Sequence, residues 1–312
     1  MGSRNISLRQ LGYLLSVADH GSMTAAAEAI QVSQASISVG INDLERRLGA
    51  RLLIRHPGQG VSLTEAGESV VDDARRVVAA VDDLYASARS PDHRIRGKVS
   101  MGCFTTLAPF YLPPLLASLA TDCPAVELDV TEGSQVDLRR ALIEGTCDIA
   151  LTYDTGLGPG LAQRTLATGQ PRVLLPADHA LATRDEVDLH DLVDERLILF
   201  SLGPSPSNAE RLLHDRGLEV DVFYRSPSIE VVRAMVAHGL GYTILVQHWP
   251  ANVSVDGLPV VGRPIAGNTP PYRVVATWNE TNPLSPRSLA VIDNLRRIAV
   301  ERDAWTERID PV

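Results

Sequence analysis

The segment from residue 22 to residue 47 constrains the fold of this chain more than any other part. Residues 23–30 include three consecutive alanines and predict a short helix, which Ser22 is placed to cap. The next three residues are too few for more than a tight turn, and residues 34–47 predict a second helix capped by Ser33. Because small alanine side chains let two helices approach closely at a steep angle, the segment predicts a helix-turn-helix.

The second of these helices has one apolar and one polar face. Ile37, Ile41 and Leu44 recur at helical spacing and predict a buried stripe. The opposite face carries small and polar side chains, which can enter the major groove of DNA. We predict DNA contacts from this part of the chain by Ser22, Thr24, Ser33, Gln34, Ala35, Ser36, Ser38, Val39, Asn42 and Arg55.

The segment and the residues after it resemble the N-terminal signature of the LysR-type transcriptional regulators. The spacings match at Ser22, Ala26-Ala27, Val32-Ser33-Gln34, Ser38, Ile41, Leu44-Glu45, Leu48-Gly49, Arg51-Leu52-Leu53, Arg55 and Leu63-Thr64-Glu65-Ala66-Gly67. The resemblance implies a domain that reads operator DNA. The alternative is an alanine-rich helical hairpin with a purely structural role.

The chain also departs from this family pattern. Val39-Gly40 stands where the family often has Arg-Gln, and Asn42 where it often has arginine. Gly40 should weaken the middle of its helix by about 1 kcal/mol relative to alanine. The predicted wing tip, residues 56–60, lacks a basic residue that is common in the family. We therefore expect fewer phosphate contacts than in a typical member.

Charge is distributed unevenly along the chain. The net charge of the whole sequence is −9, which by itself disfavours a nucleic-acid partner. Within residues 1–60, however, six arginines stand against four carboxylates, which gives +2 and leaves −11 for the remainder. This asymmetry is typical of a mildly basic DNA reader joined to an acidic sensor.

Several classes of protein are disfavoured by the composition. No apolar run is long enough to span a membrane, and the N-terminus does not resemble a signal peptide, so we expect a cytoplasmic location. Cys103, Cys123 and Cys147 form no paired motif and are interpreted as packing residues, with redox sensing through Cys103 as an alternative. The eight histidines lack metal-ligand spacing, so we predict no metal and no cofactor.

Residues 1–64 are predicted to form a winged helix-turn-helix, in which residues 52–54 and 61–63 pair as the wing. Thr64 is placed to cap a long linker helix over residues 65–90, which ends near residues 90–92. A heptad pattern in this helix predicts a coiled-coil dimer seam, and the alternative is packing on the chain's own effector domain. The seam residues are Val71, Ala74, Val78, Val81, Tyr85 and Ala88.

Residues 95–303 alternate between strands and helices and predict an α/β domain. Strands are predicted at 99–103, 126–130, 148–153, 172–175, 196–200, 220–224, 242–246 and 272–278, and helices at 107–120, 136–144, 207–216, 229–238 and 287–298. This half resembles the family's effector domain, similar in fold to a type 2 periplasmic binding protein. The residues that carry the likeness are Pro113, Leu115-Leu116, Cys147-Asp148-Ile149-Ala150-Leu151, Asp178-His179-Ala180-Leu181-Ala182, Val232, Met235-Val236 and Gly239-Leu240-Gly241. The resemblance implies two subdomains around a cleft: residues 96–162 with 271–300, and residues 163–270.

Polar residues at the ends of the predicted strands are candidate ligands for an effector, because clefts in α/β folds open there. Thr105 and Thr106 lie between a strand and a helix, where backbone N–H groups favour an anion. We predict effector contacts by Thr105, Thr106, Thr152, Tyr153, Ser201, Ser228, Tyr242 and Thr243.

Together these features predict a ligand-responsive transcription factor, not an enzyme, that binds double-stranded DNA and a small, anionic effector. The resemblance implies self-association as a dimer or tetramer, and the lack of a long apolar run predicts no membrane partner. An enzyme built on a binding-protein-like fold is a second possibility, but no common nucleophile, phosphate-loop or zinc-protease motif is present. A pure solute-binding module is a third possibility, which the missing export signal disfavours.

Overall fold

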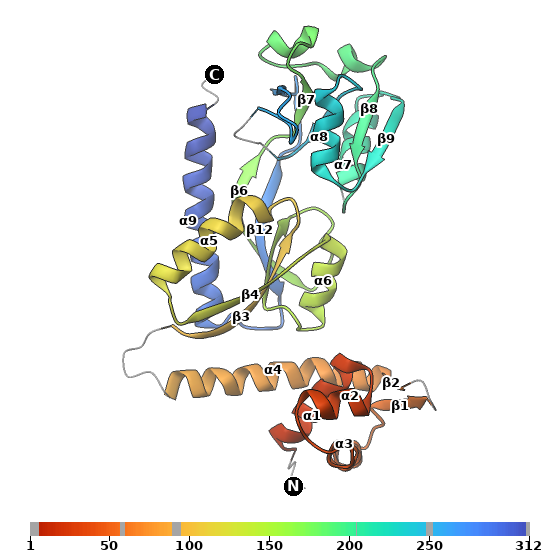
Figure 1. The fold of residues 1–312 in the computed structure, drawn as a ribbon, viewed down its shortest axis with the longest axis vertical. Helices are drawn as coiled ribbons and strands as arrows, with labels where there is room; N and C mark the ends of the chain where they lie inside the picture. Colours follow the sequence, from red (N-terminus) through yellow and green to blue (C-terminus); the bar gives the residue numbers. More distant parts are fainter. Residues whose placement is uncertain (1–5, 57–59, 89–94, 204, 248–251, 310–312) are drawn as a thin grey trace. The chain divides into compact units, whose positions relative to one another are not determined.

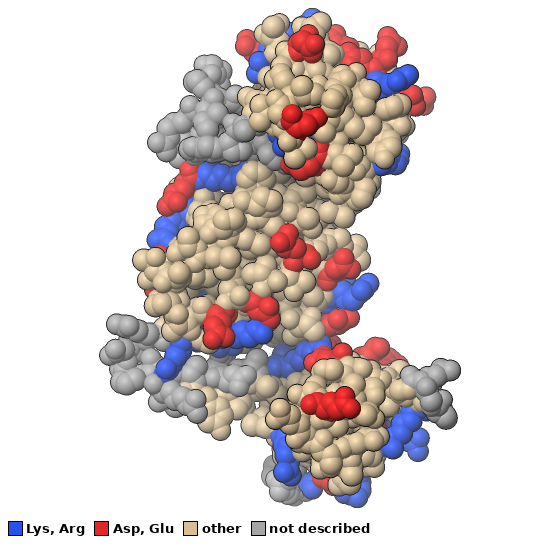
Figure 2. Space-filling view, viewed as in Figure 1, with Lys and Arg blue, Asp and Glu red and all other residues tan. Residues whose placement is uncertain are grey.

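The computed structural model describes residues 6–56, 60–88, 95–203, 205–247 and 252–309 (Figure 1). The chain divides into two compact units, one comprising Met1–Gly97 with Glu144–Thr146 and the other Lys98–Ile143 with Cys147–Val312. Within the described part of the chain, no helix combines the length and the apolar character that a membrane span needs. Figure 2 shows acidic side chains recurring over the part of the second unit that holds β7 to β9, and both signs of charge on the first unit.

The first unit contains the predicted helix-turn-helix. Its elements are α1 (Leu8–His20), α2 (Met23–Ala29), α3 (Gln34–Leu48), β1 (Leu53–His56), β2 (Gly60–Leu63) and α4 (Glu65–Ala88). Both predicted caps are confirmed, because the Oγ of Ser22 accepts from the Ala25 amide at 3.4 Å and that of Ser33 from the Ser36 amide at 3.1 Å. The predicted stripe is also confirmed, since Ile37, Ile41 and Leu44 are fully buried in the core of this unit.

Gly40 has a role that local helix propensity did not indicate. A Cβ atom at this position would lie 2.6 Å from Cδ2 of Tyr13. Glycine therefore lets the Tyr13 ring of α1 lie directly against the backbone of α3. The expected cost to the helix is accompanied by a close packing contact that alanine would disturb.

The wing is an antiparallel pair in which Leu53 lies opposite Leu63. Of the predicted tip, residues 56–60, the residues 57–59 lie outside the described residues. At Gly60 (φ 92°), a Cβ atom would lie 2.5 Å from the carbonyl oxygen of Gly21, and the Val61 amide donates to that oxygen at 3.0 Å. The wing thus packs on the turn between α1 and α2.

Helix α4 begins as predicted, with the Oγ1 of Thr64 accepting from the Gly67 amide at 2.9 Å. The same hydroxyl donates to the carbonyl oxygen of Arg51 at 2.7 Å. A Cβ atom at Gly67 would lie 2.1 Å from the carbonyl oxygen of Leu52. The Thr64-to-Gly67 part of the family signature therefore anchors the linker helix to the start of the wing.

The predicted dimer seam is wrong for its first two positions. Val71 and Ala74 are 3% and 2% exposed, because this part of α4 packs on α1 and joins the core of the first unit. Farther along the helix, Val77 and Leu84 are 44% and 68% exposed. The side chain of Ala88 and the predicted helix end at residues 90–92 lie outside the described residues.

The first subdomain of the second unit is built on a five-stranded sheet in the order β4-β3-β5-β12-β6 (Figure 1). The strands are β3 (Gly97–Phe104), β4 (Val126–Gly133), β5 (Ile149–Tyr153), β6 (Leu161–Gly169) and β12 (Tyr272–Asn279). β12 runs antiparallel to both β5 and β6, whereas β3 and β5 are parallel. Helices α5 (Ala108–Asp122) and α9 (Pro286–Ile309) pack against each other, and α6 (Gln135–Ile143) packs on β5 and β12.

The second subdomain contains two small sheets, ordered β10-β7-β11 and β8-β9. Their strands are β7 (Arg172–Pro176), β8 (Leu197–Phe200), β9 (Val222–Ser226), β10 (Thr243–Leu245) and β11 (Val260–Pro264). Helices α7 (Ser205–His214) and α8 (Ile229–Ala237) cover them, and two 3-10 turns, η1 (Ala180–Thr183) and η2 (Leu189–Leu192), follow β7. The predicted α/β fold with two subdomains is confirmed.

Two strands, β6 and β11, were not predicted from the sequence. Because residues 163–169 belong to β6 of the first sheet, the predicted subdomain boundary after residue 162 is wrong. The chain instead passes between the subdomains at residues 170–171 and again at 266–271. Leu166 is the one buried residue of strand β6 and the others are half-buried or exposed, so its sequence lacks the apolar run that marks a buried strand.

Candidate DNA-reading face and effector pocket

Helix α3 exposes a continuous face along its first two turns. Gln34, Ala35, Ser36, Val39 and Asn42 are exposed and Ser38 is half-buried. Thr24, on α2, is exposed as well. The predicted DNA contacts Ser22 and Ser33 use their side-chain oxygens to cap α2 and α3, so their evident role is to hold the reading helices in place.

Two side chains connect α3 to the wing. NH2 of Arg55, on β1, donates to Oδ1 of Asn42 at 2.8 Å, which brings two predicted DNA contacts together. Glu45 accepts the Leu52 and Leu53 amides through Oε1, at 2.7 and 3.1 Å. Hydrogen bonds between Asn42 and Arg55 and between Glu45 and the backbone of residues 52 and 53 therefore hold the wing in place relative to α3.

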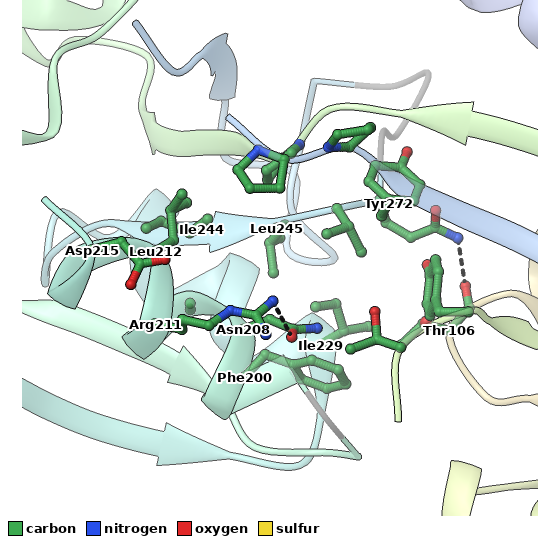
Figure 3. A pocket seen from close by; sticks show the side chains of 18 residues that line it. Thr106, Phe200, Asn208, Arg211, Leu212, Asp215, Ile229, Ile244, Leu245 and Tyr272 are labelled. Atoms are coloured by element: carbon green, nitrogen blue, oxygen red, sulfur yellow. Dashed lines mark hydrogen bonds between the residues drawn. The ribbon is translucent and has the colours of Figure 1, made fainter. Parts of the chain in front are cut away.

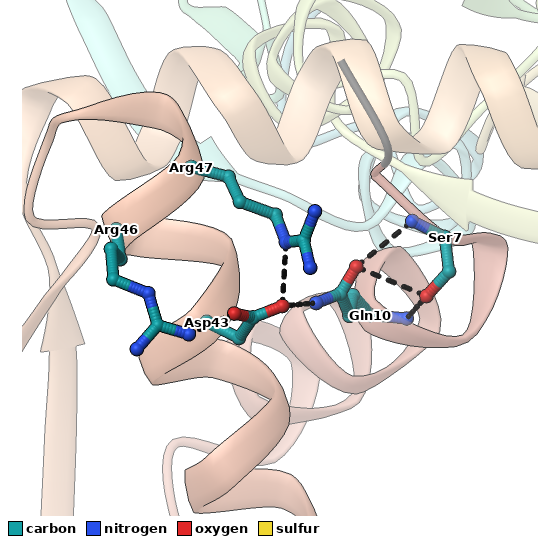
Figure 4. Close-up of polar contacts among 5 residues, drawn as sticks. All are labelled: Ser7, Gln10, Asp43, Arg46 and Arg47. Carbon is teal, nitrogen blue, oxygen red and sulfur yellow. Dashed lines mark hydrogen bonds and ion pairs between the residues drawn. The ribbon is translucent and has the colours of Figure 1, made fainter. Parts of the chain in front are cut away.

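A polar cluster around Asp43 was missed at the level of sequence (Figure 4). The Asp43 carboxylate accepts from Nε of Arg47 at 2.6 Å and from Nε2 of Gln10 at 2.7 Å, and it pairs with Arg46. Gln10 also forms a capping box with Ser7 at the start of α1. Hydrogen bonds from Arg47 and then Arg46 hold the pKa of Asp43 at about 2. The helical spacing of Asp43 with the two arginines was a readable signal, but the contact with Gln10 was not.

A pocket opens within the second unit, lined by residues of both subdomains and of both crossing segments (Figure 3). The space free of protein atoms, counted out to the open mouth and including solvent there, is about 960 Å³. Its apolar lining includes Tyr153, Pro171, Phe200, Leu212, Ile229, Ile244, Leu245, Val246, Pro270, Pro271 and Tyr272. Its polar lining comprises Thr106, Thr155, Asn208, Arg211, Asp215 and Gln247.

Two hydrogen bonds join polar lining residues of the pocket (Figure 3). Nε2 of Gln247 donates to the carbonyl oxygen of Thr106 at 2.9 Å. On α7, NH2 of Arg211 donates to Oδ1 of Asn208 at 3.3 Å, and Asp215 follows one helical turn after Arg211. The lining thus includes one cation, Arg211, and one carboxylate, Asp215.

Tyr153 combines burial with an unsatisfied hydroxyl. Its ring makes edge-to-face contacts with Phe104 and Tyr272, at centroid distances of 5.6 and 5.7 Å. No described residue meets hydrogen-bonding geometry with its OH, which is buried. Burial raises the pKa of Tyr153, and the nearby Thr106 side chain offsets part of that rise. The neutral hydroxyl can therefore donate to an acceptor bound in the pocket.

Of the eight predicted effector contacts, Thr106 and Tyr153 line this pocket. The amide and Oγ1 of Thr105 both donate to the carbonyl oxygen of Gly133, at 3.3 Å each, and Ser228 caps α8. Ser201 is half-buried, with its amide bonded to the carbonyl oxygen of Ser226. The remaining three, Thr152, Tyr242 and Thr243, are fully buried.

The backbone before α5 is less suited to an anion than predicted. The N-cap residue Leu107 makes no side-chain capping bond, and its amide donates to the carbonyl oxygen of Phe104 at 2.8 Å. The Phe110 amide donates back to Leu107 at 3.0 Å, and Pro109 has no N–H group. The amides of Leu107 and Phe110 are therefore already bonded to backbone carbonyl oxygens, and Pro109 supplies no amide donor for an anion.

The environment of the three cysteines agrees with a packing role, since Cys103 and Cys147 are buried and Cys123 is half-buried. Burial raises the pKa of both Cys103 and Cys147 to about 12, so both are neutral thiols at physiological pH. Sγ of Cys147 accepts from the Gly102 amide at 3.0 Å, and Cys123 is half-buried at the end of α5. Across the described ranges, no three histidine, cysteine or acidic side chains gather in a way that could hold a metal ion.

Comparison with known proteins identifies a family for each of the two parts of the chain. Residues 8–68 match the model of the bacterial regulatory helix-turn-helix proteins of the lysR family, and residues 92–299 match the LysR substrate binding domain. The chain is 28% identical over 293 residues to a hydrogen peroxide-inducible genes activator of Pectobacterium carotovorum subsp. carotovorum, covering 93% of this chain and 96% of the relative. It is 33% identical over 250 residues to the uncharacterized regulator YnfL of Escherichia coli K12, covering 77% and 82%.

Among solved structures, that of HinK, a LysR family regulator from Pseudomonas aeruginosa, superposes with a TM-score of 0.63 at 30% identity. The match covers 94% of this chain and 98% of HinK. The chain belongs to the LysR family and is a ligand-responsive, DNA-binding transcription regulator.

Proposed function

We propose that the exposed face of α3 reads operator DNA and that a small amphipathic monoanion in the pocket controls this binding. The observation that supports DNA reading is the capped helix α3, which presents an exposed face along residues 34–42. A helix held in this way can enter the major groove with its N-terminal residues foremost. We further propose that the protein acts by binding rather than catalysis, in the cytoplasm where its DNA lies.

The chemistry of the pocket supports an amphipathic monoanion as the ligand. Its walls are mainly apolar and aromatic, which favours a ligand with an apolar body. Arg211 can pair with a carboxylate, but Asp215 one turn away opposes a second negative charge. The Tyr153 hydroxyl supplies an unused donor. A ligand with one carboxylate and a flat or compact apolar body fits these groups.

Matched carboxylates and amides test the ligand class. Benzoate, phenylacetate and 1-naphthoate, each beside its neutral amide, would be added to the full chain in thermal-shift and calorimetric titrations. We expect the carboxylates to bind more tightly than the amides, and Arg211→Gln to remove that difference. Arg184→Gln is the matched control, because Arg184 is exposed in the same subdomain and pairs with Asp191. Equal binding of acids and amides by the wild type would refute the proposed ligand class.

A redox response is the competing function, because several relatives are named as hydrogen peroxide-inducible genes activators. Thiolate is the reactive form of cysteine, and Cys103 and Cys147 are held as buried thiols. We therefore expect peroxide to leave the operator affinity of the wild type unchanged in a mobility-shift assay. A peroxide effect that Cys103→Ser abolishes would instead establish the redox function.

We propose that the protein dimerises through the second half of α4. Val77, Val81 and Leu84 follow one another at helical spacings of four and three, and two of them are exposed. One reader covers only half of a two-fold operator, which is the reason to expect a dimer. Leu84→Asp should halve the mass in sedimentation velocity, whereas Val136→Asp, at an exposed valine of α6, should not. Unchanged mass in Leu84→Asp would exclude this seam.

A further inference from the structure

The reading face of α3, along residues 34–42, presents no basic side chain and one exposed large apolar side chain, Val39. Residues 34–42 contain neither lysine nor arginine. Val39 is 69% exposed, while the apolar stripe on the opposite face is fully buried. The most frequent specific contact to DNA, arginine or lysine to guanine, is therefore not available from this segment.

Val39 is surrounded by short side chains. Ala35 lies one turn before it and Asn42 nearly one turn after it, so the three share a face. Ser38 and Gly40 flank it in sequence, and Gly40 lies against the ring of Tyr13. No long side chain of residues 35–40 stands between Val39 and an approaching surface, so its two methyl groups can reach the floor of a groove.

The neighbouring polar residue is held in one orientation. Oδ1 of Asn42 accepts from NH2 of Arg55, which leaves the amide nitrogen of Asn42 as the group available to DNA. In the major groove, an A·T pair offers the N7 acceptor of adenine and the C5-methyl group of thymine. An amide donor beside an exposed isopropyl group matches that pair.

We propose that Val39 reads the C5-methyl group of a thymine in the major groove, so that this chain selects an A·T pair at that operator position. The inference rests on the proposed function, since it requires α3 to enter the major groove. It adds a specificity-determining contact at a position where this chain carries valine instead of a charged residue.

Removing only the methyl group of thymine tests the contact. Operator DNA would be enriched by the wild-type full chain from a random duplex pool, and each thymine would then be replaced singly by deoxyuridine. In fluorescence anisotropy at fixed salt, we expect one substitution per half-site to weaken wild-type binding about three- to fourfold, the value of one buried methyl group. At that position, Val39→Ala should bind the thymine and uracil duplexes equally.

Two further variants separate apolar contact from shape and from general effects. Val39→Thr keeps the shape but replaces one methyl group with a hydroxyl, and should lose part of the preference for thymine. Val136→Ala removes an exposed valine from α6, 65% exposed, and should keep the full preference. Because Val39 is exposed, alanine there should leave the melting temperature of the chain nearly unchanged.

The outcomes distinguish a failure of DNA reading by α3 from a failure of the Val39 contact alone. If the wild type enriches no operator, the proposed DNA-reading function fails and this inference falls with it. If an operator is enriched and bound but the thymine-to-uracil ratio is the same in the wild type and Val39→Ala at every position, only the inference fails. A sensitive thymine that Val39→Ala still distinguishes would assign the methyl contact to another residue and would also overturn it.

Discussion

The reading face and the effector pocket are built in opposite ways. The reading face lies along residues 34–42 of one helix, and its side chains are exposed or half-buried. The residues that support it all belong to the first unit. The pocket collects residues from Thr106 to Tyr272, from both subdomains and both crossing segments, and it is mainly apolar. A change in the support of α3 should therefore affect DNA binding alone, whereas pocket substitutions should affect the ligand and the second unit.

The largest expected effect concerns the junction of the wing and α4. Gly67→Ala places a Cβ atom 2.1 Å from the carbonyl oxygen of Leu52, so helix or strand must shift. We expect the first unit to lose about 3 kcal/mol of stability, as for an overpacked site. Hydrogen exchange of the full chain would show reduced protection in α1, α3 and α4 and unchanged protection in the second unit.

Gly12→Ala is the control for that substitution, since nothing lies within 4 Å of a Cβ at this position of α1. Alanine there should increase helix stability by up to about 1 kcal/mol. Loss of protection in the second unit of Gly67→Ala would show that the stabilities of the two units are coupled, so that the reading face and the pocket are not independent.

The next effect is on DNA readout. Gln34 is the first residue of α3 and is exposed. If its amide bonds a base edge, Gln34→Ala should cost about 2 kcal/mol on the selected operator and little on random DNA. Gln163→Ala, at an exposed glutamine of β6, should leave both affinities unchanged. An equal loss on operator and random DNA would remove Gln34 from sequence recognition.

A smaller effect of opposite sign is expected in the pocket. Tyr153→Phe removes a buried hydroxyl that has no described partner, so the ligand-free protein should gain about 1 kcal/mol of stability. The same substitution should weaken binding of a carboxylate probe that accepts from this hydroxyl. Denaturant unfolding followed by tryptophan fluorescence would report the first effect and calorimetry the second. A less stable Tyr153→Phe variant would mean that the hydroxyl is satisfied in solution.

The smallest effect is a titration in the first unit. Because the pKa of Asp43 is lowered to about 2, its ion pairs stabilise the fold fully above its ordinary pKa of 3.8. That contribution is lost as pH falls through about 2. Carboxyl carbon NMR of the full chain should show this low pKa, and Arg47→Gln should raise it more than Arg46→Gln. The reverse order would indicate that Arg46 is the principal partner.

Several features of the first unit were predictable because their causes are local. The caps Ser22, Ser33 and Thr64 act within three residues along the chain, and the stripe from Ile37 to Leu44 follows the helical period. The heptad failed at Val71 and Ala74 because the same spacing serves equally for packing on α1. Periodicity identifies a buried face but does not identify what covers it.

The effector residues were harder to predict because their grouping depends on chain closure. Arg211 and Asp215 look like the solvent face of an ordinary amphipathic helix, and Pro171 and Pro270 look like loop residues. They meet only because β6 and β12 pair in one sheet and bring the two crossing segments together. By contrast, Thr105 was singled out by its place after a strand, yet its hydroxyl donates to the carbonyl oxygen of Gly133.

The sequence by itself determined the family, the helix-turn-helix and the order of the α/β elements, since capping and periodicity act over a few residues. Tertiary structure alone decided which side chains line the pocket, why Gly40 and Gly67 lack a side chain, and where the subdomains divide. These depend on contacts between residues that are distant along the chain. Such contacts arise only when elements that are each compatible with many arrangements pack into one.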